Sequence, residues 1–89
     1  MTTLDIASDE VVSSTNRALR FLNMKVNCMF PFELLQINSA TKNDNGHLAL
    51  NVNLKTKGSP NTTFVFELNV NPAGNNPDTY LVSQKQLSP

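Results

Sequence analysis

The sequence predicts an α+β domain in which one amino-terminal helix packs across a four-stranded antiparallel meander sheet. The main observation is two runs in which every second residue is apolar, a period typical of strands with one buried face and one wet face. The apolar positions are Leu48, Leu50, Val52 and Leu54 in the first run, and Phe64, Phe66, Leu68 and Val70 in the second. Between the runs, residues 56–61 are rich in turn formers, which predicts a hairpin.

An isolated two-stranded hairpin is marginally stable in water, so its apolar face needs a cover. The stretch after Ser8 supplies one. Ser8 is a suitable helix cap, and Asp9 and Glu10 follow in the first turn, where the helix dipole favours negative charge. An apolar stripe then recurs every three or four residues, at Val11, Thr15, Ala18, Leu22 and Val26. We therefore expect an amphipathic helix that ends near Asn27 and covers the hairpin.

Two further strands are expected on either side of the hairpin. The first runs from Phe32 to Ala40, and its irregular alternation indicates either packing on both faces near its start or a bulge or bend. The last runs from Thr79 to Leu87, with Tyr80, Val82 and Leu87 as its apolar residues, after a loop over 71–78. Residues 1–7 carry no periodic pattern and are expected to form a loose tail. The whole chain, residues 1–89, is thus predicted to be one domain.

Composition restricts the classes of partner. Charged residues make up 16% of the chain, the formal net charge is zero, and thirteen asparagines supply much of the polar surface. Nucleic acids and anionic membranes are bound through a positive field, so neither partner is expected.

The single cysteine, Cys28, excludes an intramolecular disulfide. The first residues have the pattern of neither a signal peptide nor a membrane span, which favours a cytoplasmic location. The triplet Asn61-Thr62-Thr63 has the pattern of a glycosylation site, and it leaves secretion open as an alternative.

No set of residues predicts catalysis, a metal or a cofactor, so we do not expect an enzyme. Cys28 and His47 would be the nucleophile and base of a catalytic pair, but they stand nineteen positions apart on different expected elements. A small buried thiol and a solvated histidine are the simpler interpretations. The alternative, a small enzyme or ligand-binding domain that uses Cys28 or His47, remains a hypothesis.

The order of elements resembles the cystatin family, whose members inhibit papain-like cysteine proteases. The helix segment Arg17-Ala18-Leu19-Arg20-Phe21 is similar to a segment of the cystatin helix. The stretch from Leu35 to Gly46, continued by the strand over 48–54, is similar to the family's first hairpin. Residues 64–70 followed by Pro72 are similar to its third long strand and second loop. The resemblance implies a non-enzymatic protein-binding module.

The same resemblance places the contact residues at the loop tips: Asn43, Asp44, Asn45 and Gly46 in the first loop, and Pro72 and Ala73 in the second. Only the glycine remains of the family's Gln-x-Val-x-Gly motif, and Ala73 stands where the family carries tryptophan. Apolar anchors provide most of the affinity of such an interface, so the resemblance implies weak inhibition or another protein partner. A self-associating protein that dimerises through an edge strand is the further alternative.

Overall fold

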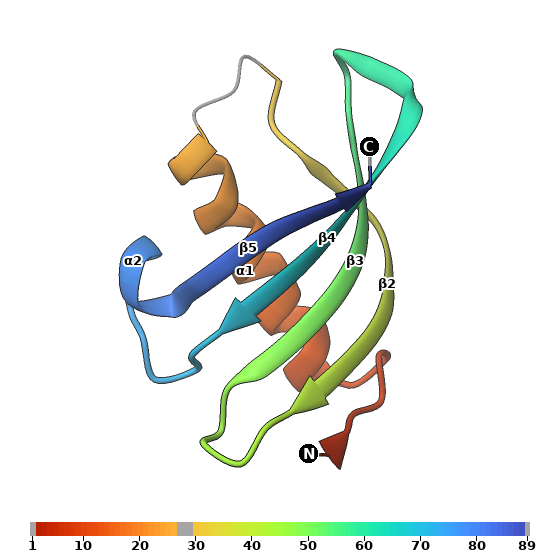
Figure 1. Ribbon diagram of the computed structural model, residues 1–89. Helices are drawn as coiled ribbons and strands as arrows, with labels where there is room; N and C mark the ends of the chain where they lie inside the picture. The colour runs from red at the N-terminus through yellow and green to blue at the C-terminus, as the bar shows by residue number, and fades with distance from the viewer. Residues whose placement is uncertain (1, 27–29, 89) are drawn as a thin grey trace.

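The computed structural model describes residues 2–26 and 30–88, and the expected end of the helix at Asn27 lies outside them. The elements are β1 (Thr2–Thr3), α1 (Asp9–Val26), β2 (Glu33–Lys42), β3 (Leu48–Thr56), β4 (Ser59–Val70), α2 (Pro77–Tyr80) and β5 (Leu81–Ser88). The strands form one antiparallel sheet in the order β1-β2-β3-β4-β5, and α1 lies across one face of it (Figure 1). The α+β class is confirmed, but the sheet has five strands and not four.

The central hairpin of β3 and β4 has the predicted faces. Leu50 pairs with Leu68, and Val52 pairs with Phe66. All the alternate apolar residues of the two strands are buried except Phe64, which is half-buried against the core. Phe32 packs edge-on against the rings of Phe64 and Phe66, with centroid separations of 5.6 and 5.2 Å. Removal of this continuous apolar surface from water is the main driving force for folding.

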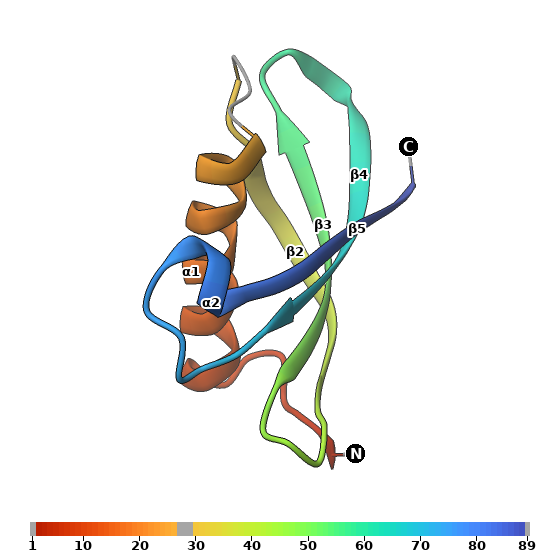
Figure 2. The same ribbon diagram turned by 60° about the vertical axis from the view of Figure 1, so that its left-hand side comes forward.

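Helix α1 covers this surface (Figure 2). The Ser8 hydroxyl accepts a hydrogen bond from the Val11 backbone N–H at 3.3 Å, so Ser8 is the cap that was predicted. Val11, Thr15, Ala18 and Leu22 are fully buried, but Val26 is 38% exposed. Val26 is the last residue of α1, one turn beyond Leu22, which is the last buried position of the stripe. The inclusion of Val26 in the stripe is therefore wrong.

Bulges, one of the two expected causes, explain the irregular alternation of β2. Leu34 pairs with Leu54 and Gln36 with Asn53, so Leu35 is left without a partner in the ladder and is 47% exposed. A second shift follows Ile37. Each extra residue restores the inward orientation of the next apolar side chain, which allows Leu34 and Ile37 to pack against the same core.

The fifth strand comes from the segment that was expected to be a loose tail. Thr2 and Thr3 form β1 and pair with Lys42 and Thr41 of β2, and the Leu4 N–H donates to the Ala40 carbonyl at 2.8 Å. Two threonines carry no detectable period, so only the neighbouring strand defines this element.

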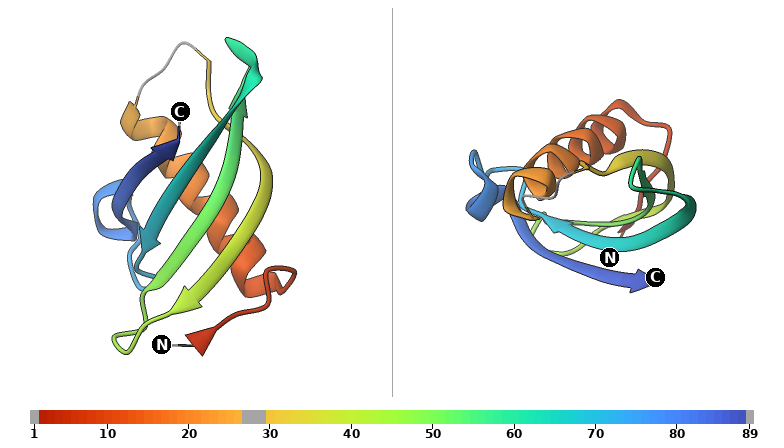
Figure 3. Two further views of the ribbon diagram at one scale, coloured as in Figure 1. Left: turned by 45° about the vertical axis from the view of Figure 1, so that its right-hand side comes forward. Right: turned by 90° about the horizontal axis from the view of Figure 1, so that it is seen from above.

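The last strand begins two residues later than predicted, because Thr79 and Tyr80 belong to the short helix α2. Tyr80 and Leu81 are buried, whereas Val82 and Leu87 are 50% and 45% exposed. Both exposed residues fall where the register between β4 and β5 shifts. Both are apolar residues of the last strand, as predicted, but neither is buried in the core, since a bulge residue need not follow the alternation. Figure 3 shows the twist of the sheet beneath α1.

Candidate protein-binding site

Two loops that carry the predicted contact residues leave the sheet at the same end. Lys42, the last residue of β2, pairs with Leu48, the first residue of β3, and Leu48 in turn pairs with Val70, the last residue of β4. The loop over 43–47 and the loop that follows Val70 therefore start level with one another. β1 lies at this end as well, since Thr2 pairs with Lys42 (Figure 1).

The first loop, residues 43–47, is a tight turn held by asparagine side chains. The Asn43 Oδ1 accepts the His47 N–H at 2.9 Å, and the Asn45 Oδ1 lies 3.1 Å from the same nitrogen. Gly46 has a φ of 86°, in the left-handed region that favours glycine. Asn43, Asp44 and Asn45 are exposed and Gly46 is half-buried. The predicted contact residues of this loop thus form an accessible polar tip.

The second loop, residues 71–80, is a compact unit. The Asn71 N–H donates to the Tyr80 carbonyl at 2.8 Å and closes the loop at its base. The Gly74 N–H donates to the Asn71 carbonyl at 2.9 Å, and this turn leaves Pro72 and Ala73 exposed. The two predicted contact residues of this loop are therefore accessible too.

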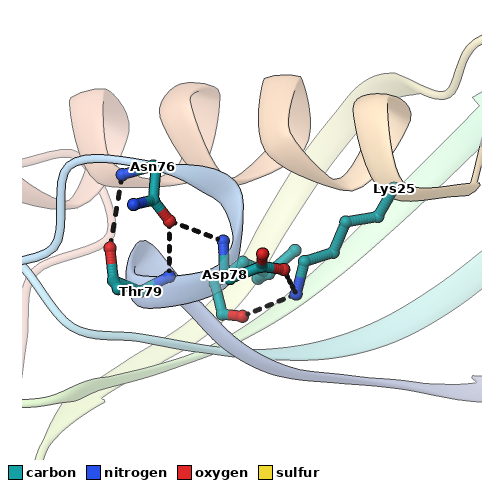
Figure 4. Close-up of polar contacts among 5 residues, drawn as sticks. Lys25, Asn76, Asp78 and Thr79 are labelled. Atoms are coloured by element: carbon teal, nitrogen blue, oxygen red, sulfur yellow. Dashed lines mark hydrogen bonds and ion pairs between the residues drawn. The ribbon is translucent and has the colours of Figure 1, made fainter.

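A capping box explains why the second loop contains a helical turn (Figure 4). The Asn76 Oδ1 accepts the N–H groups of Asp78 and Thr79, both at 3.0 Å, and the Thr79 Oγ1 lies 3.3 Å from the Asn76 nitrogen. Pro77 stands at the first helical position, where its missing N–H costs nothing. The sequence signal for α2 was present in residues 76–79, although we interpreted this stretch as loop and strand.

The second loop folds back against α1 and does not project beside the first loop (Figure 2). Gly74 is buried, and a Cβ atom there would lie 2.4 Å from the carbonyl carbon and oxygen of Thr79. The Tyr80 hydroxyl donates to the Ser14 carbonyl at 3.2 Å, and the Tyr80 ring meets Phe21 edge-on at 5.4 Å. These contacts fix the loop to the middle of the helix.

Lys25 holds the other end of α2 from the last turn of α1 (Figure 4). Its Nζ donates to the Leu81 carbonyl at 3.1 Å and lies 3.8 Å from the Asp78 carboxylate. The Asp78 side chain is 92% exposed, so water screens most of this ion pair. The hydrogen bond to the backbone is the stronger of the two contacts.

A small pocket lies where the second loop meets the helix. It has a volume of about 200 Å³ and is lined by Ser13, Ser14, Arg17, Pro72 and Tyr80. The Arg17 guanidinium stacks over the Tyr80 ring at 4.5 Å and reaches the Gly74 carbonyl at 3.4 Å. Sequence reasoning missed this pocket, since Arg17 and Tyr80 are sixty-three positions apart and no local pattern connects them. We call it the Arg17 pocket.

The opposite face of the sheet is lined with amides, as the alternation predicts. The Asn38 Nδ2 donates to the side-chain oxygens of Asn51 and Asn53 at 2.9 and 2.8 Å, and Asn69 donates to Ser83 at 3.0 Å. Many of these amides are already bonded to one another, so the face offers fewer groups to a partner than its composition indicates.

Of the two residues in the alternative enzyme or ligand-binding hypothesis, Cys28 and His47, the structure describes only His47. Cys28 lies outside the described residues. His47 is half-buried and is the last residue of the first loop, directly before β3. In the described part of the chain, no three histidine, cysteine, aspartate or glutamate side chains are grouped as a metal ion would require. Over the same residues, no helix is both long enough and apolar enough to cross a bilayer.

Comparisons with protein-family models, with curated proteins and with solved structures each gave no match.

Proposed function

We propose that this chain is a non-enzymatic protein-binding module that contacts its partner through the end of the sheet formed by β1 and the two loops. One observation carries the proposal: Lys42, Leu48 and Val70 are level in the sheet, so the loop over 43–47 and the loop after Val70 leave it at one end, before the second loop turns back along α1. Binding and catalytic residues are found disproportionately on loops that a rigid scaffold positions. The helix segment 17–21 and the order of the loops resemble cystatins, and this resemblance supports the same end of the sheet as the binding surface.

The partner class that this resemblance favours is a papain-like cysteine protease. The tips, however, consist of Asn43, Asp44, Asn45 and Gly46 in one loop and Pro72 and Ala73 in the other. None of these side chains provides the aromatic anchor on which tight interfaces depend. We therefore infer weak inhibition, or binding of another protein through the same surface.

A gain-of-function variant tests the proposal more sharply than the wild-type chain alone. Ala73 is exposed, so Ala73→Trp adds an aromatic anchor to the second loop without a change in the core. Papain is titrated with the wild-type chain and with this variant. If the loop enters the protease cleft, the variant inhibits about tenfold to a hundredfold more tightly, as expected for burial of one large apolar side chain.

Asn61→Trp is the matched control, because Asn61 is exposed near the start of β4, at the other end of the sheet from the two loops. The control should inhibit like the wild type. No inhibition by the wild type or by Ala73→Trp at a micromolar excess would remove the protease-inhibitor proposal. Equal gains from both tryptophans would show non-specific adhesion and would contradict binding through the loop end.

Self-association is the second candidate function, and β5 favours it. This eight-residue strand is the last in the sheet, and it carries Val82 and Leu87 as large exposed apolar residues with Lys85 as its one charge. A long edge with so little charge is a template for pairing with another strand. Sedimentation equilibrium at about 100 μM should show a dimer with a Kd near 10 μM if the edge pairs. The double substitution Val82→Lys and Leu87→Lys should then restore the monomer, and a monomeric wild type would remove this candidate.

A further inference from the structure

In the part of the chain that the structure describes, the guanidinium of the Arg17 pocket has no acidic partner. The ion pairs among the described residues join Asp78 to Lys25 and Glu10 to Lys42, both at 3.8 Å, and none of them includes Arg17. Within residues 2–26 and 30–88, the guanidinium makes one hydrogen bond, the 3.4 Å contact with the Gly74 carbonyl. A guanidinium has five N–H donors, so most of its donor capacity is available to a ligand.

The surroundings of Arg17 hold the guanidinium in place before any ligand arrives. Its carbon lies 4.5 Å from the Tyr80 ring centre and 5.6 Å from that of Phe21. Tyr80 is itself fixed, because it is only 2% exposed and its hydroxyl is bonded to the Ser14 carbonyl. A planar fork that is already oriented loses little conformational entropy when it forms paired hydrogen bonds.

The remaining walls select a small oxygen-bearing anion. Ser13 and Ser14 line the pocket beside Arg17. The Ser13 hydroxyl already donates to the Asp9 carbonyl at 2.6 Å, so the Ser14 hydroxyl is the one that can donate to a carboxylate oxygen. The volume of about 200 Å³ is below the range of about 300–1,000 Å³ that is typical of pockets for whole small molecules. One acidic group fits this space, and the fork geometry of arginine matches a planar carboxylate through two parallel hydrogen bonds.

We propose that the Arg17 pocket binds a carboxylate, supplied by an aspartate or glutamate side chain or by a chain terminus of the protein partner. The source of the carboxylate rests on the proposed function. Pro72 connects the pocket with the proposed binding surface, since it lines the pocket and is also one of the predicted contact residues of the second loop. A partner seated on Pro72 and Ala73 brings its acidic group to Arg17.

The first arm of the test uses a free carboxylate and does not depend on any partner. The ¹⁵N-labelled chain is titrated with sodium acetate at constant ionic strength, and the Arg17 Nε–H and the amides of Ser13, Ser14 and Gly74 are followed by NMR. One pair of charge-assisted hydrogen bonds corresponds to a Kd of about 10–100 mM, so these signals should shift together and saturate. Shifts that stay linear with concentration would overturn the proposal.

Matched variants assign the binding to the guanidinium fork. Arg17→Lys keeps the positive charge but loses the paired donors, and we expect acetate affinity to fall at least about fivefold. Arg20 is exposed on the same helix, so Arg20→Lys should leave the titration unchanged. An equal loss from both variants would show general attraction to a basic surface. Saturation by inorganic phosphate and not by acetate would overturn the choice of ligand. If Arg17→Lys does not fold, the wild-type titration still decides.

The second arm separates this inference from the proposed function. Papain inhibition by the Ala73→Trp chain is measured with and without Arg17→Lys. Tenfold weaker inhibition in the double variant supports a carboxylate supplied by the partner. Saturable acetate binding without any inhibition keeps the carboxylate site and removes the protease as its source. Unchanged inhibition in the double variant would overturn the link between the pocket and the partner.

Discussion

The two loops at the candidate binding end differ in what holds them. The first loop, 43–47, is stabilised by its own asparagines and contacts solvent at its tip, whereas the second loop, 71–80, is packed against α1 through Gly74 and Tyr80. Each contains a glycine, but Gly46 is required by its φ of 86° and Gly74 by lack of space. Loops of similar composition can therefore be constrained by the backbone alone or by tertiary packing. Substitutions at the two glycines should therefore destabilise the chain to different extents.

The largest effect is expected at Gly74. A methyl group in Gly74→Ala would overlap the backbone of Thr79, which cannot move without breaking the capping box. We expect a loss of about 2 kcal/mol or more in the free energy of unfolding, measured by urea denaturation.

Gly58→Ala is the control for this substitution. A Cβ at Gly58 also meets an atom at 2.6 Å, but this atom belongs to the Phe30 ring, which is 43% exposed and free to shift. The control should cost less than about 0.5 kcal/mol. Similar losses at both positions would contradict the packed character of the second loop.

A smaller effect is expected at Gly46, where nothing lies within 4 Å of the Cβ position. Gly46→Ala should cost about 1 kcal/mol because an L residue is strained in the left-handed region. Gly46→Asn should cost less, since asparagine adopts this conformation more readily. Urea denaturation of both variants measures the order. An alanine that is as stable as glycine would show that the turn can relax and that φ does not constrain the first loop.

The smallest effect is expected where Lys25 holds α2. Lys25→Gln should destabilise the chain by about 0.5–1 kcal/mol, since it removes the charge-assisted hydrogen bond to the Leu81 carbonyl. Asp78→Asn should change stability by less than about 0.3 kcal/mol, because the ion pair is exposed. Thermal unfolding of the two variants checks the difference. A larger loss for Asp78→Asn would make the ion pair the main connection.

The hairpin and its cover followed from local patterns in the sequence. The alternation in 48–54 and 64–70 and the stripe from Val11 to Leu22 predicted which side chains are buried. These periods are set by the geometry of a single strand or helix, so they can be read without knowledge of the neighbours. The predicted contact residues fall in loops for the same reason, since turn formers mark the ends of strands. Their role in binding stays a prediction.

The sequence by itself thus determined the α+β class, the buried face of the central hairpin and the cap at Ser8. Only the tertiary structure decided that Thr2 and Thr3 form a strand, that the second loop turns back onto α1, and that Arg17 and Tyr80 line one pocket. The physical reason is the range of the interactions. Period and capping act within a few residues, whereas an edge pairing or a stacked guanidinium depends on groups that only the folded chain brings together.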